Sequence, residues 1–257
     1  MQATGPDTVV KFLFTSGSTK LPKAVINTQR MICANQVQIT QSIPALQEPP
    51  PVLVDWMPWN HTAGGNHNFF LCVANGGSLY IDEGKPTPAL IGETIRNLRE
   101  VAPTWYFNVP VGFEALARAM QTDDQLRRNF FSRLSSMMYA GAALSQQVQD
   151  ALYELSEREY GERIVMTAGL GMTESGPFAL FVTNPHAQAG HVGLPAAGLE
   201  IKLVDMGDKR EIRYRGPNIT PGYWRNPEAT AEHFDEEGFF RTGDAVAWID
   251  PQDVHLG

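Results

Sequence analysis

The chain has 257 residues, of which 43% are hydrophobic, and a net charge of −8 at pH 7. This size allows a substantial core in one large or two modest domains, and the negative charge argues against non-specific binding to nucleic acid or to an anionic membrane. Cys33 and Cys72 show no metal-ligand spacing, the start of the chain is unlike a signal peptide, and no apolar run approaches the roughly 20 residues of a membrane span. We therefore expect a cytoplasmic protein with reduced thiols and no nucleic-acid partner.

Strand-like and helix-like segments alternate through the first two-thirds of the chain. The predicted strands are the mainly apolar runs 9–14, 52–57, 78–81, 104–109, 134–140 and 163–167. The predicted helices run from Asn27 or Thr28 to before Pro44, then over 66–74, 87–101, 111–120, a segment from about 123, and 145–160. Strands separated by helices predict an α/β fold, with a largely parallel sheet and helices on both of its faces.

The pattern of apolar and polar residues changes near residue 190. Short alternating runs at 199–204 and 211–215 are divided by glycine and proline. Such runs predict a small, β-rich, barrel-like antiparallel subdomain. We therefore divide the chain into an α/β part, 1–188, and a β-rich part, 189–257.

A polar segment directly follows the first predicted strand. Its residues are Thr15, Ser16, Gly17, Ser18, Thr19, Lys20, Leu21, Pro22 and Lys23. Hydroxyl and backbone N–H groups can donate to phosphate oxygens, Gly17 allows close approach of the backbone, and Lys23 adds positive charge. The spacing differs from the G-x-x-x-x-G-K-[ST] loop of common NTPases. On its own, the segment is equally compatible with a Ser/Thr-rich surface turn.

This segment resembles the Thr-Ser-Gly-Ser-Thr-Gly-x-Pro-Lys-Gly loop of the adenylate-forming family, which includes acyl- and aryl-CoA synthetases, luciferases and peptide-synthetase adenylation domains. Lys20 and Ala24 stand where that family usually has glycine. Three later segments resemble other motifs of the family, in the family's order: Gly-Leu-Gly-Met-Thr-Glu at 169–174, Arg-Gly-Pro-Asn-Ile-Thr-Pro-Gly-Tyr-Trp at 215–224 and Gly-Phe-Phe-Arg-Thr-Gly-Asp at 238–244. Four matches over nearly the whole chain exclude a chance similarity.

The resemblance implies a role for each motif in binding ATP. The loop would hold the β- and γ-phosphates, with Lys23, Thr173 and Glu174 as the catalytic residues. Thr173 would contact the α-phosphate, and Glu174 would bind Mg²⁺, a hard ion that prefers carboxylate oxygens. A glutamate taken alone is most commonly an exposed loop carboxylate, but the place of Glu174 in Gly-Met-Thr-Glu after a predicted strand favours the metal role.

The resemblance also implies where the adenosine lies. The nucleotide-binding segment beside Thr173 would include Leu170, Gly171 and Met172, with Leu170 in place of the family's usual aromatic residue. The small-residue turn Gly141, Ala142 and Ala143 would line the adenine pocket, although an ordinary packing turn has the same composition. Asp244 would accept hydrogen bonds from the ribose hydroxyls, the alternative being a simple turn aspartate.

The segment 56–68 suggests the pocket for the acid. Trp59 and His61 would contact the substrate, since His61 stands where the family has a histidine near the carboxylate. A lone histidine is more often structural, and we expect that role for His67. The sequence Trp-Asn-His-Thr at 59–62, followed by Gly-Gly-Asn-His-Asn, is most similar to feruloyl-CoA synthases.

The implied activity is that of an ATP-, Mg²⁺- and coenzyme A-dependent ligase acting on a small carboxylic acid, aromatic such as ferulate or else fatty. The resemblance also implies that the family's small C-terminal domain, with its catalytic lysine, and a leading portion are absent, so we expect this chain alone to form little or no thioester. Three alternatives stay open. The chain could be an adenylation domain that loads a carrier protein, a degenerate nucleotide-binding module, as Lys20 and Leu170 would suggest, or a structural fragment that binds no nucleotide.

Overall fold

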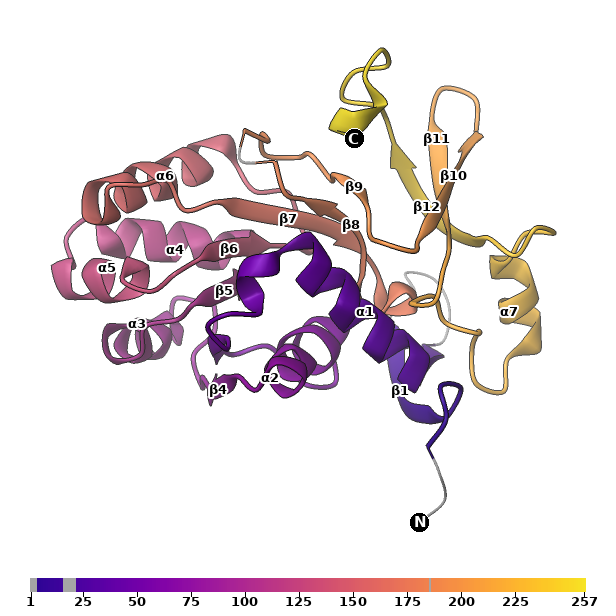
Figure 1. Cartoon of the computed structure of the whole chain (residues 1–257), viewed down its shortest axis with the longest axis horizontal. Coiled ribbons are helices and arrows are strands. Elements are labelled where there is room, and N and C mark those ends of the chain that lie inside the picture. Colours follow the sequence, from indigo (N-terminus) through magenta and orange to yellow (C-terminus); the bar gives the residue numbers. More distant parts are fainter. Residues whose placement is uncertain (1–3, 16–21, 185) are drawn as a thin grey trace.

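The computed structural model describes residues 4–15, 22–184 and 186–257. Most of the predicted phosphate loop, namely Ser16, Gly17, Ser18, Thr19 and Lys20, lies outside the described residues. The described part contains a main sheet covered by helices and a small antiparallel sheet beside it (Figure 1). None of its helices is long and apolar enough to cross a membrane.

The main sheet is mixed rather than wholly parallel. Its strands, in spatial order within the described ranges, are β5 (Trp105–Asn108), β6 (Ser136–Tyr139), β7 (Met166–Gly171), β8 (Phe178–Val182) and β9 (Leu194–Pro195). The first three run parallel, as the alternation of strands and helices predicts, whereas β8 and β9 are antiparallel additions. The sequence pattern does not predict β8, because only a short segment with one 3-10 turn, Thr173–Ser175, and no α-helix, separates that strand from β7.

Helices cover both faces of this sheet, as predicted (Figure 1). One face carries α3 (Ile91–Glu100), α4 (Pro110–Met120), α5 (Asp124–Phe131) and α6 (Gln146–Tyr160), and the other carries α1 (Gln29–Ser42) and α2 (Phe69–Asn75). Successive side chains of β5 point to opposite faces of the sheet, so this strand contributes to a hydrophobic core on each face. Tyr106 packs with α4–α6, whereas Trp105 and Phe107 pack in the core that includes residues of α1 and α2.

Local capping signals set several helix boundaries. The side chains of Thr28, Asp123 and Ser145 accept hydrogen bonds from the backbone N–H groups at the starts of α1, α5 and α6, which confirms the predicted starts. Gly76, with a φ of +65°, ends α2. The helix predicted at 66–74 begins differently, because a π-helical turn, Ala63–Asn68, precedes α2.

Two shorter sheets lie in the first third of the chain. β1 (Val9–Thr15) pairs antiparallel with β2 (Lys23–Thr28), and their register places Thr15 opposite Lys23. The sequence pattern does not predict β2, which leads directly into α1. β3 (Val52–Asp55) and β4 (Ser78–Ile81) form a parallel pair, as their connection through α2 predicts.

The final third contains β10 (Glu200–Asp205), β11 (Arg210–Arg215) and β12 (Phe240–Val246), with α7 (Pro227–His233) before β12. These strands pair antiparallel, as predicted, but the barrel-like expectation is wrong: among the described residues they form an open sheet, since three strands are too few to close a barrel.

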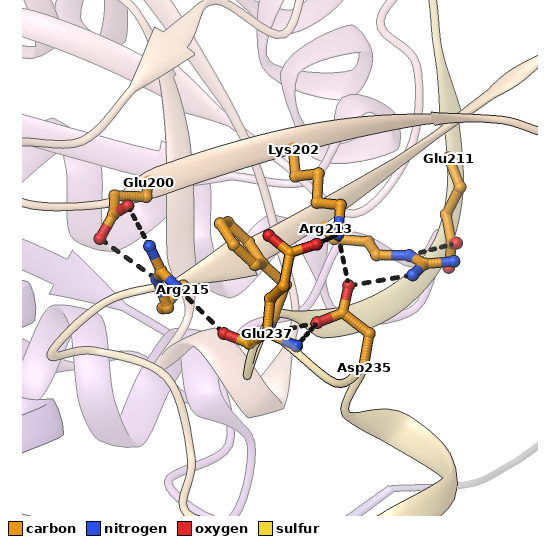
Figure 2. Close-up of polar contacts among 8 residues, drawn as sticks. Glu200, Lys202, Glu211, Arg213, Arg215, Asp235 and Glu237 are labelled. Carbon is orange, nitrogen blue, oxygen red and sulfur yellow. Dashed lines mark hydrogen bonds and ion pairs between the residues drawn. The ribbon is translucent and has the colours of Figure 1, made fainter.

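An ionic cluster lies on this sheet and on the turn before β12 (Figure 2). It consists of Glu200, Lys202, Glu211, Arg213, Arg215, Asp235 and Glu237. The division at residue 188 stays a prediction, and β9, beyond that boundary, pairs with β8 of the main sheet.

Candidate active site

A cavity of about 1000 Å³ lies at the carboxyl ends of β5, β6 and β7. Segments that follow parallel strands meet at this edge of a sheet, which is where α/β proteins commonly bind ligands. The ends of β1 and β2, residues of the segment 56–63, the start of β8, residues 190–192 and one residue of β12 also contribute to its lining. The cavity is therefore assembled from parts of the chain that are distant in sequence.

Most of the predicted site residues in the described ranges line this one cavity. They are Thr15, Lys23, His61, Gly141, Ala142, Ala143, Leu170, Gly171, Met172, Thr173, Glu174 and Asp244. Trp59 is an exception. Its side chain is half exposed, its ring lies 5.1 Å from the ring of Phe69, and it is absent from the lining of the cavity. The turn in the segment 56–63 directs Trp56, and not Trp59, to the cavity, so the predicted substrate contact of Trp59 has no geometric support.

Thr15 and Lys23 lie opposite each other at the ends of β1 and β2, and both line the cavity. The Thr15 hydroxyl oxygen is buried and has no hydrogen-bond partner within the described residues. The Lys23 ammonium lies 4.5 Å from the centre of the Tyr223 ring and 2.9 Å from His233 Nε2. A hydroxyl and an ammonium at one edge of the cavity form an arrangement that can bind phosphate oxygens.

Glu174 lies in a tight turn directly after β7. A Cβ atom on Gly171 would lie only 1.8 Å from the Pro177 carbonyl oxygen, so glycine is required where the chain turns back towards β8. Glu174 is only 4% exposed, which excludes the exposed-loop alternative. Its Oε1 accepts a hydrogen bond of 2.8 Å from the Tyr223 hydroxyl. Burial, together with the neighbouring Glu174 carboxylate, raises the pKa of Tyr223, so this phenol remains the donor at physiological pH.

The residues around Glu174 fit a magnesium ion delivered with phosphate groups. Within the described residues, no group of three or more His, Cys, Asp or Glu side chains gathers into a metal cage. A single buried carboxylate that lines a cavity suits Mg²⁺, which is commonly held by one or two carboxylates, substrate phosphates and water. The site therefore offers one protein ligand and leaves the other positions to substrate oxygens.

The predicted adenosine side combines a turn after β6 with a residue of the small sheet. Gly141 has a φ of +87°, a conformation that favours glycine, and the turn through Ala143 presents little side-chain bulk to the cavity. Asp244 is half-buried on β12, and burial raises the pKa of its carboxyl group. Asp244 thus faces the same cavity as Glu174, although 70 residues separate them in the sequence.

The other part of the cavity is apolar and aromatic. Trp56 and Phe107 line it together with Met57, Val109 and Phe178. The indole N–H of Trp56 donates a hydrogen bond of 3.1 Å to Asn108 Oδ1, which orients this wall. Such a surface suits the hydrocarbon part of a substrate.

The two histidines of the segment 56–68 have different environments. His61 lines the cavity, and its Nδ1 accepts a hydrogen bond of 3.1 Å from the Ala63 N–H. In a neutral ring this leaves Nε2–H as the donor. His67 is fully buried against Phe107 and Phe178, and burial lowers its pKa to about 4, so it is structural, as predicted.

Several lining residues and neighbours carry no direct sequence signal. Tyr223 belongs to a segment that resembles a family motif, but the motif alone does not indicate its hydrogen bond to Glu174. His233 reaches Lys23 across 210 positions of the chain. Phe107 is the easiest to anticipate, because it lies near the carboxyl end of a predicted strand.

Known proteins are similar to this chain in sequence and in fold. The family described as AMP-binding enzyme matches residues 1–224. The long-chain-fatty-acid–CoA ligase of Salmonella typhimurium is 28% identical over 95% of this chain and 43% of its own length, and the feruloyl-CoA synthase of an Amycolatopsis species is 27% identical over 96% and 48%. A solved malonyl-CoA ligase with methylmalonyl-CoA and AMP bound is similar with a TM-score of 0.78 and 27% identity, covering 96% of this chain and 52% of that one. The chain thus spans slightly under half the length of these curated relatives.

Proposed function

Because the chain belongs to the AMP-binding enzyme family, we propose that its cavity binds ATP beside a carboxylic acid and that the protein activates the acid for transfer to coenzyme A. The observation that carries this proposal is the composition of the cavity. It combines Lys23, Glu174 and Asp244 with an apolar aromatic wall. A charged nucleotide and the hydrocarbon part of an acid therefore have separate surfaces within one space.

In the proposed reaction, a carboxylate oxygen of the acid attacks the α-phosphorus of ATP, and the bond to pyrophosphate breaks. The acyl-AMP then reacts with the thiol of coenzyme A, which releases AMP and leaves a thioester. The protein mainly orients the reactants and stabilises phosphate charge. Lys23 and Thr15 would bind the terminal phosphates, Thr173 the α-phosphate and Asp244 the ribose. Mg²⁺ held by Glu174 would neutralise phosphate charge.

We place the acid along the apolar wall and propose an aromatic acid such as ferulate as the substrate. The rings of Phe107, Phe178 and Trp56 would contact a planar substrate over a large apolar area. His61, whose Nε2–H is the free donor of the neutral ring, would hydrogen-bond the carboxylate. The feruloyl-CoA synthase among the relatives agrees with this choice, and the fatty-acid ligase keeps a fatty acid as the competing substrate.

Titration calorimetry with adenosine, AMP and ATP, with and without Mg²⁺, tests the nucleotide assignments. Glu174→Gln should weaken MgATP binding, and its effect should shrink when Mg²⁺ is omitted. Asp244→Ala should weaken the binding of adenosine, AMP and ATP alike, because it removes an acceptor for the ribose hydroxyls that all three carry. Glu154→Gln and Asp150→Ala, exposed positions of α6 outside the cavity, are the matched controls. Equal losses for every ligand in both site variants would contradict the two roles.

Pyrophosphate exchange with ferulate and with a long-chain fatty acid tests the choice of acid. We expect exchange with ferulate to exceed that with the fatty acid. Phe107→Ala should reduce exchange with ferulate while leaving adenosine binding unchanged, because the wall contacts only the acid. Faster exchange with the fatty acid than with ferulate would contradict the proposed aromatic substrate and favour a fatty acid. Nucleotide binding without exchange on either acid would favour a nucleotide-binding module instead.

A further inference from the structure

Lys23 and His233 meet at the edge of the cavity although they come from opposite ends of the chain. Lys23 begins β2, and His233 is the last residue of α7. The Lys23 Nζ atom lies 2.9 Å from His233 Nε2, and both side chains are half-buried. Lys23 lines the cavity in this position. The contact therefore involves the lysine to which the proposed function assigns phosphate binding.

The hydrogen bonds of His233 define which atom is the donor. His233 Nδ1 lies 2.7 Å from the carbonyl oxygen of Ala229, one turn earlier in α7. A carbonyl oxygen can only accept, so Nδ1 carries a hydrogen, and Nε2 of the neutral ring carries a lone pair. The Lys23 ammonium then donates to Nε2. A doubly protonated ring would instead place an N–H group against the ammonium, so this contact requires a neutral imidazole.

Aromatic neighbours restrain the imidazole ring. The Tyr223 ring packs edge-on against it at 5.2 Å between centres, and the Phe240 ring lies 5.7 Å away. Tyr223 and Phe240 are at most 4% exposed, so the ring rests against a packed surface. Nε2 is consequently held at one place beside the cavity rather than moving with a flexible side chain.

A neutral acceptor has a particular consequence for a phosphate-binding lysine. A carboxylate at this place would pair with the ammonium and weaken the field that attracts phosphate. The imidazole lone pair orients the ammonium without cancelling its charge. The ammonium has three N–H donors, so the bond to His233 leaves two for phosphate oxygens. Restricting the long lysine side chain in advance also reduces the conformational entropy lost when a ligand binds.

We propose that His233 is a positioning residue that orients Lys23 towards the cavity and leaves its full positive charge available to the phosphate groups of a bound nucleotide. This inference rests on the proposed function, since it assumes that the cavity accepts ATP. It adds a residue of α7, outside the segments that resemble the family's motifs, to the phosphate side of the site.

Three variants of His233 separate positioning from packing. His233→Gln retains an acceptor, His233→Phe keeps the aromatic ring but removes the acceptor, and His233→Glu adds a negative charge. Titration calorimetry should give dissociation constants for MgATP within about 2-fold of wild type for Gln, about 5-fold higher for Phe and about 10-fold or more higher for Glu. The effects should be smaller with AMP and absent with adenosine, because they act through phosphate.

Gln125→Glu is the matched control for the charge change, because Gln125 is exposed on α5, far from α7 in Figure 1. It should bind MgATP like wild type. If wild type binds MgATP and both His233→Phe and His233→Glu bind it equally well, the positioning role of His233 is wrong, while the proposed function still stands. Equal losses for adenosine and MgATP would also overturn it, since they indicate a packing role. If wild type binds no MgATP, the proposed function fails and this inference fails with it.

A spectroscopic measurement tests the contact without depending on the stability of a His233 variant. Nitrogen-15 NMR of the wild-type chain should show a neutral His233 ring with its hydrogen on Nδ1. Lys23→Met should shift the Nε2 resonance, because that atom loses its donor. A ring with its hydrogen on Nε2, or an Nε2 resonance that does not respond to Lys23→Met, would refute the proposed contact.

Discussion

Two polar networks of this protein differ in how they accommodate ionisable side chains. The first, the buried polar chain, consists of Asp55, Asn68 and His67 behind the aromatic wall of the cavity. Asn68 Nδ2 donates to Asp55 Oδ1 at 2.9 Å, and His67 Nδ1 donates to Asn68 Oδ1 at 2.6 Å. All three residues are at most 5% exposed. A neutral amide therefore links an acid and a base that do not touch each other.

The second network is the ionic cluster on the small sheet (Figure 2). Asp235 is its centre: Oδ2 accepts from Lys202 and from Arg213, each at 3.1 Å, and Oδ1 accepts from the N–H groups of Glu237 and Phe239. The Asp235 side chain is 4% exposed, but Lys202 is 30% exposed. Charges here are paired directly with opposite charges at the edge of solvent.

The pKa values follow this difference. Burial raises the pKa of Asp55 to about 6 and lowers that of His67 to about 4, so the buried polar chain favours neutral forms of both. Burial also opposes ionisation of Asp235, but the Phe239 N–H, Lys202 and Arg213 outweigh it and hold the pKa of Asp235 well below its usual range. Location thus decides the direction of the pKa shifts: burial moves Asp55 and His67 towards their neutral forms, whereas direct pairing with opposite charges favours the ionised form of Asp235.

The largest effect should come from breaking the buried polar chain at its centre. Asn68→Ala removes one of the two donors to Asp55 Oδ1, the other being the Met57 N–H, and removes the acceptor of the His67 Nδ1–H. The orphaned imidazole N–H costs about 1–3 kcal/mol and the lost hydrogen bond to the acid costs about 1.5–3 kcal/mol, so we expect the free energy of unfolding to fall by about 4 kcal/mol. Urea denaturation at neutral pH measures this loss. It should be the same at low salt and in about 1 M NaCl, because the groups are buried.

Asn75→Ala is the matched control for this prediction. Asn75 is half-buried on α2, and its side chain donates one hydrogen bond, to the Leu71 carbonyl. Its loss should cost only about 1 kcal/mol. If Asn68→Ala is no more destabilising than this control, the buried polar chain contributes little to stability.

The second prediction uses pH to detect the raised pKa of Asp55. In the unfolded chain Asp55 ionises near pH 3.8, but in the folded chain it ionises near pH 6. Its contribution to stability is therefore fully present at low pH and is lost as pH rises through 6. Asp55→Asn does not ionise at this position, so its stability relative to wild type should rise by about 2.4 kcal/mol between pH 4 and 7. His67 titrates in both proteins, so its contribution largely cancels in the difference.

Urea denaturation across this pH range measures the effect, and Asp150→Asn, at an exposed position of α6, is the control. The control should differ from wild type by a nearly constant amount. A difference for Asp55→Asn that is flat with pH would show that Asp55 ionises normally, and the contrast between the two networks would lose its electrostatic basis.

The sequence predicts the parts of this fold that depend on local signals. Thr28, Asp123 and Ser145 cap helices as their positions indicate, and the alternation of strands and helices predicts the parallel order of β5, β6 and β7. β2 and β8 are not predicted, because antiparallel neighbours in a sheet need no α-helix between them.

The site likewise contains some residues that local sequence motifs indicate and others that only tertiary packing brings into place. Glu174 and Asp244 can be selected from short motifs, and both line one cavity, while their chemical roles stay predictions for the binding experiments. Tyr223 and His233 cannot be assigned their partners from sequence, because those contacts depend on how α7 and its preceding turn pack against the hairpin of β1 and β2. The exclusion of Trp59 from the lining depends equally on tertiary structure.

The third prediction concerns the centre of the ionic cluster. Asp235→Asn keeps the shape of the side chain and an acceptor for backbone N–H groups but removes the charge that faces Lys202 and Arg213. We expect a loss of about 1–2 kcal/mol at low salt, since solvent beside the cluster screens the pairs. In contrast to Asn68→Ala, the loss should shrink by half or more in about 1 M NaCl.

Asp205→Asn is the control for Asp235→Asn, because Asp205 forms an ion pair with Arg210 on the same sheet but is 80% exposed. Its effect should be close to zero at every salt concentration. A loss for Asp235→Asn that does not respond to salt would mean that its hydrogen bonds to the turn, and not its charge, stabilise the sheet.

The smallest effect should come from the partly exposed partner of Asp235. Lys202→Met removes an ammonium that donates to Asp235 and Glu237, but a methionine can still pack its apolar stem near the Phe239 ring. Arg213 and two backbone N–H groups remain on Asp235, so its charge stays compensated. The denaturation midpoint should therefore move less than in Asp235→Asn, and the two changes together should be less than additive because they remove one shared interaction. Full additivity in this double-mutant cycle would show that Lys202 and Asp235 do not stabilise each other. A midpoint shift for Lys202→Met larger than that for Asp235→Asn would show that Lys202, and not Asp235, is the centre of the cluster.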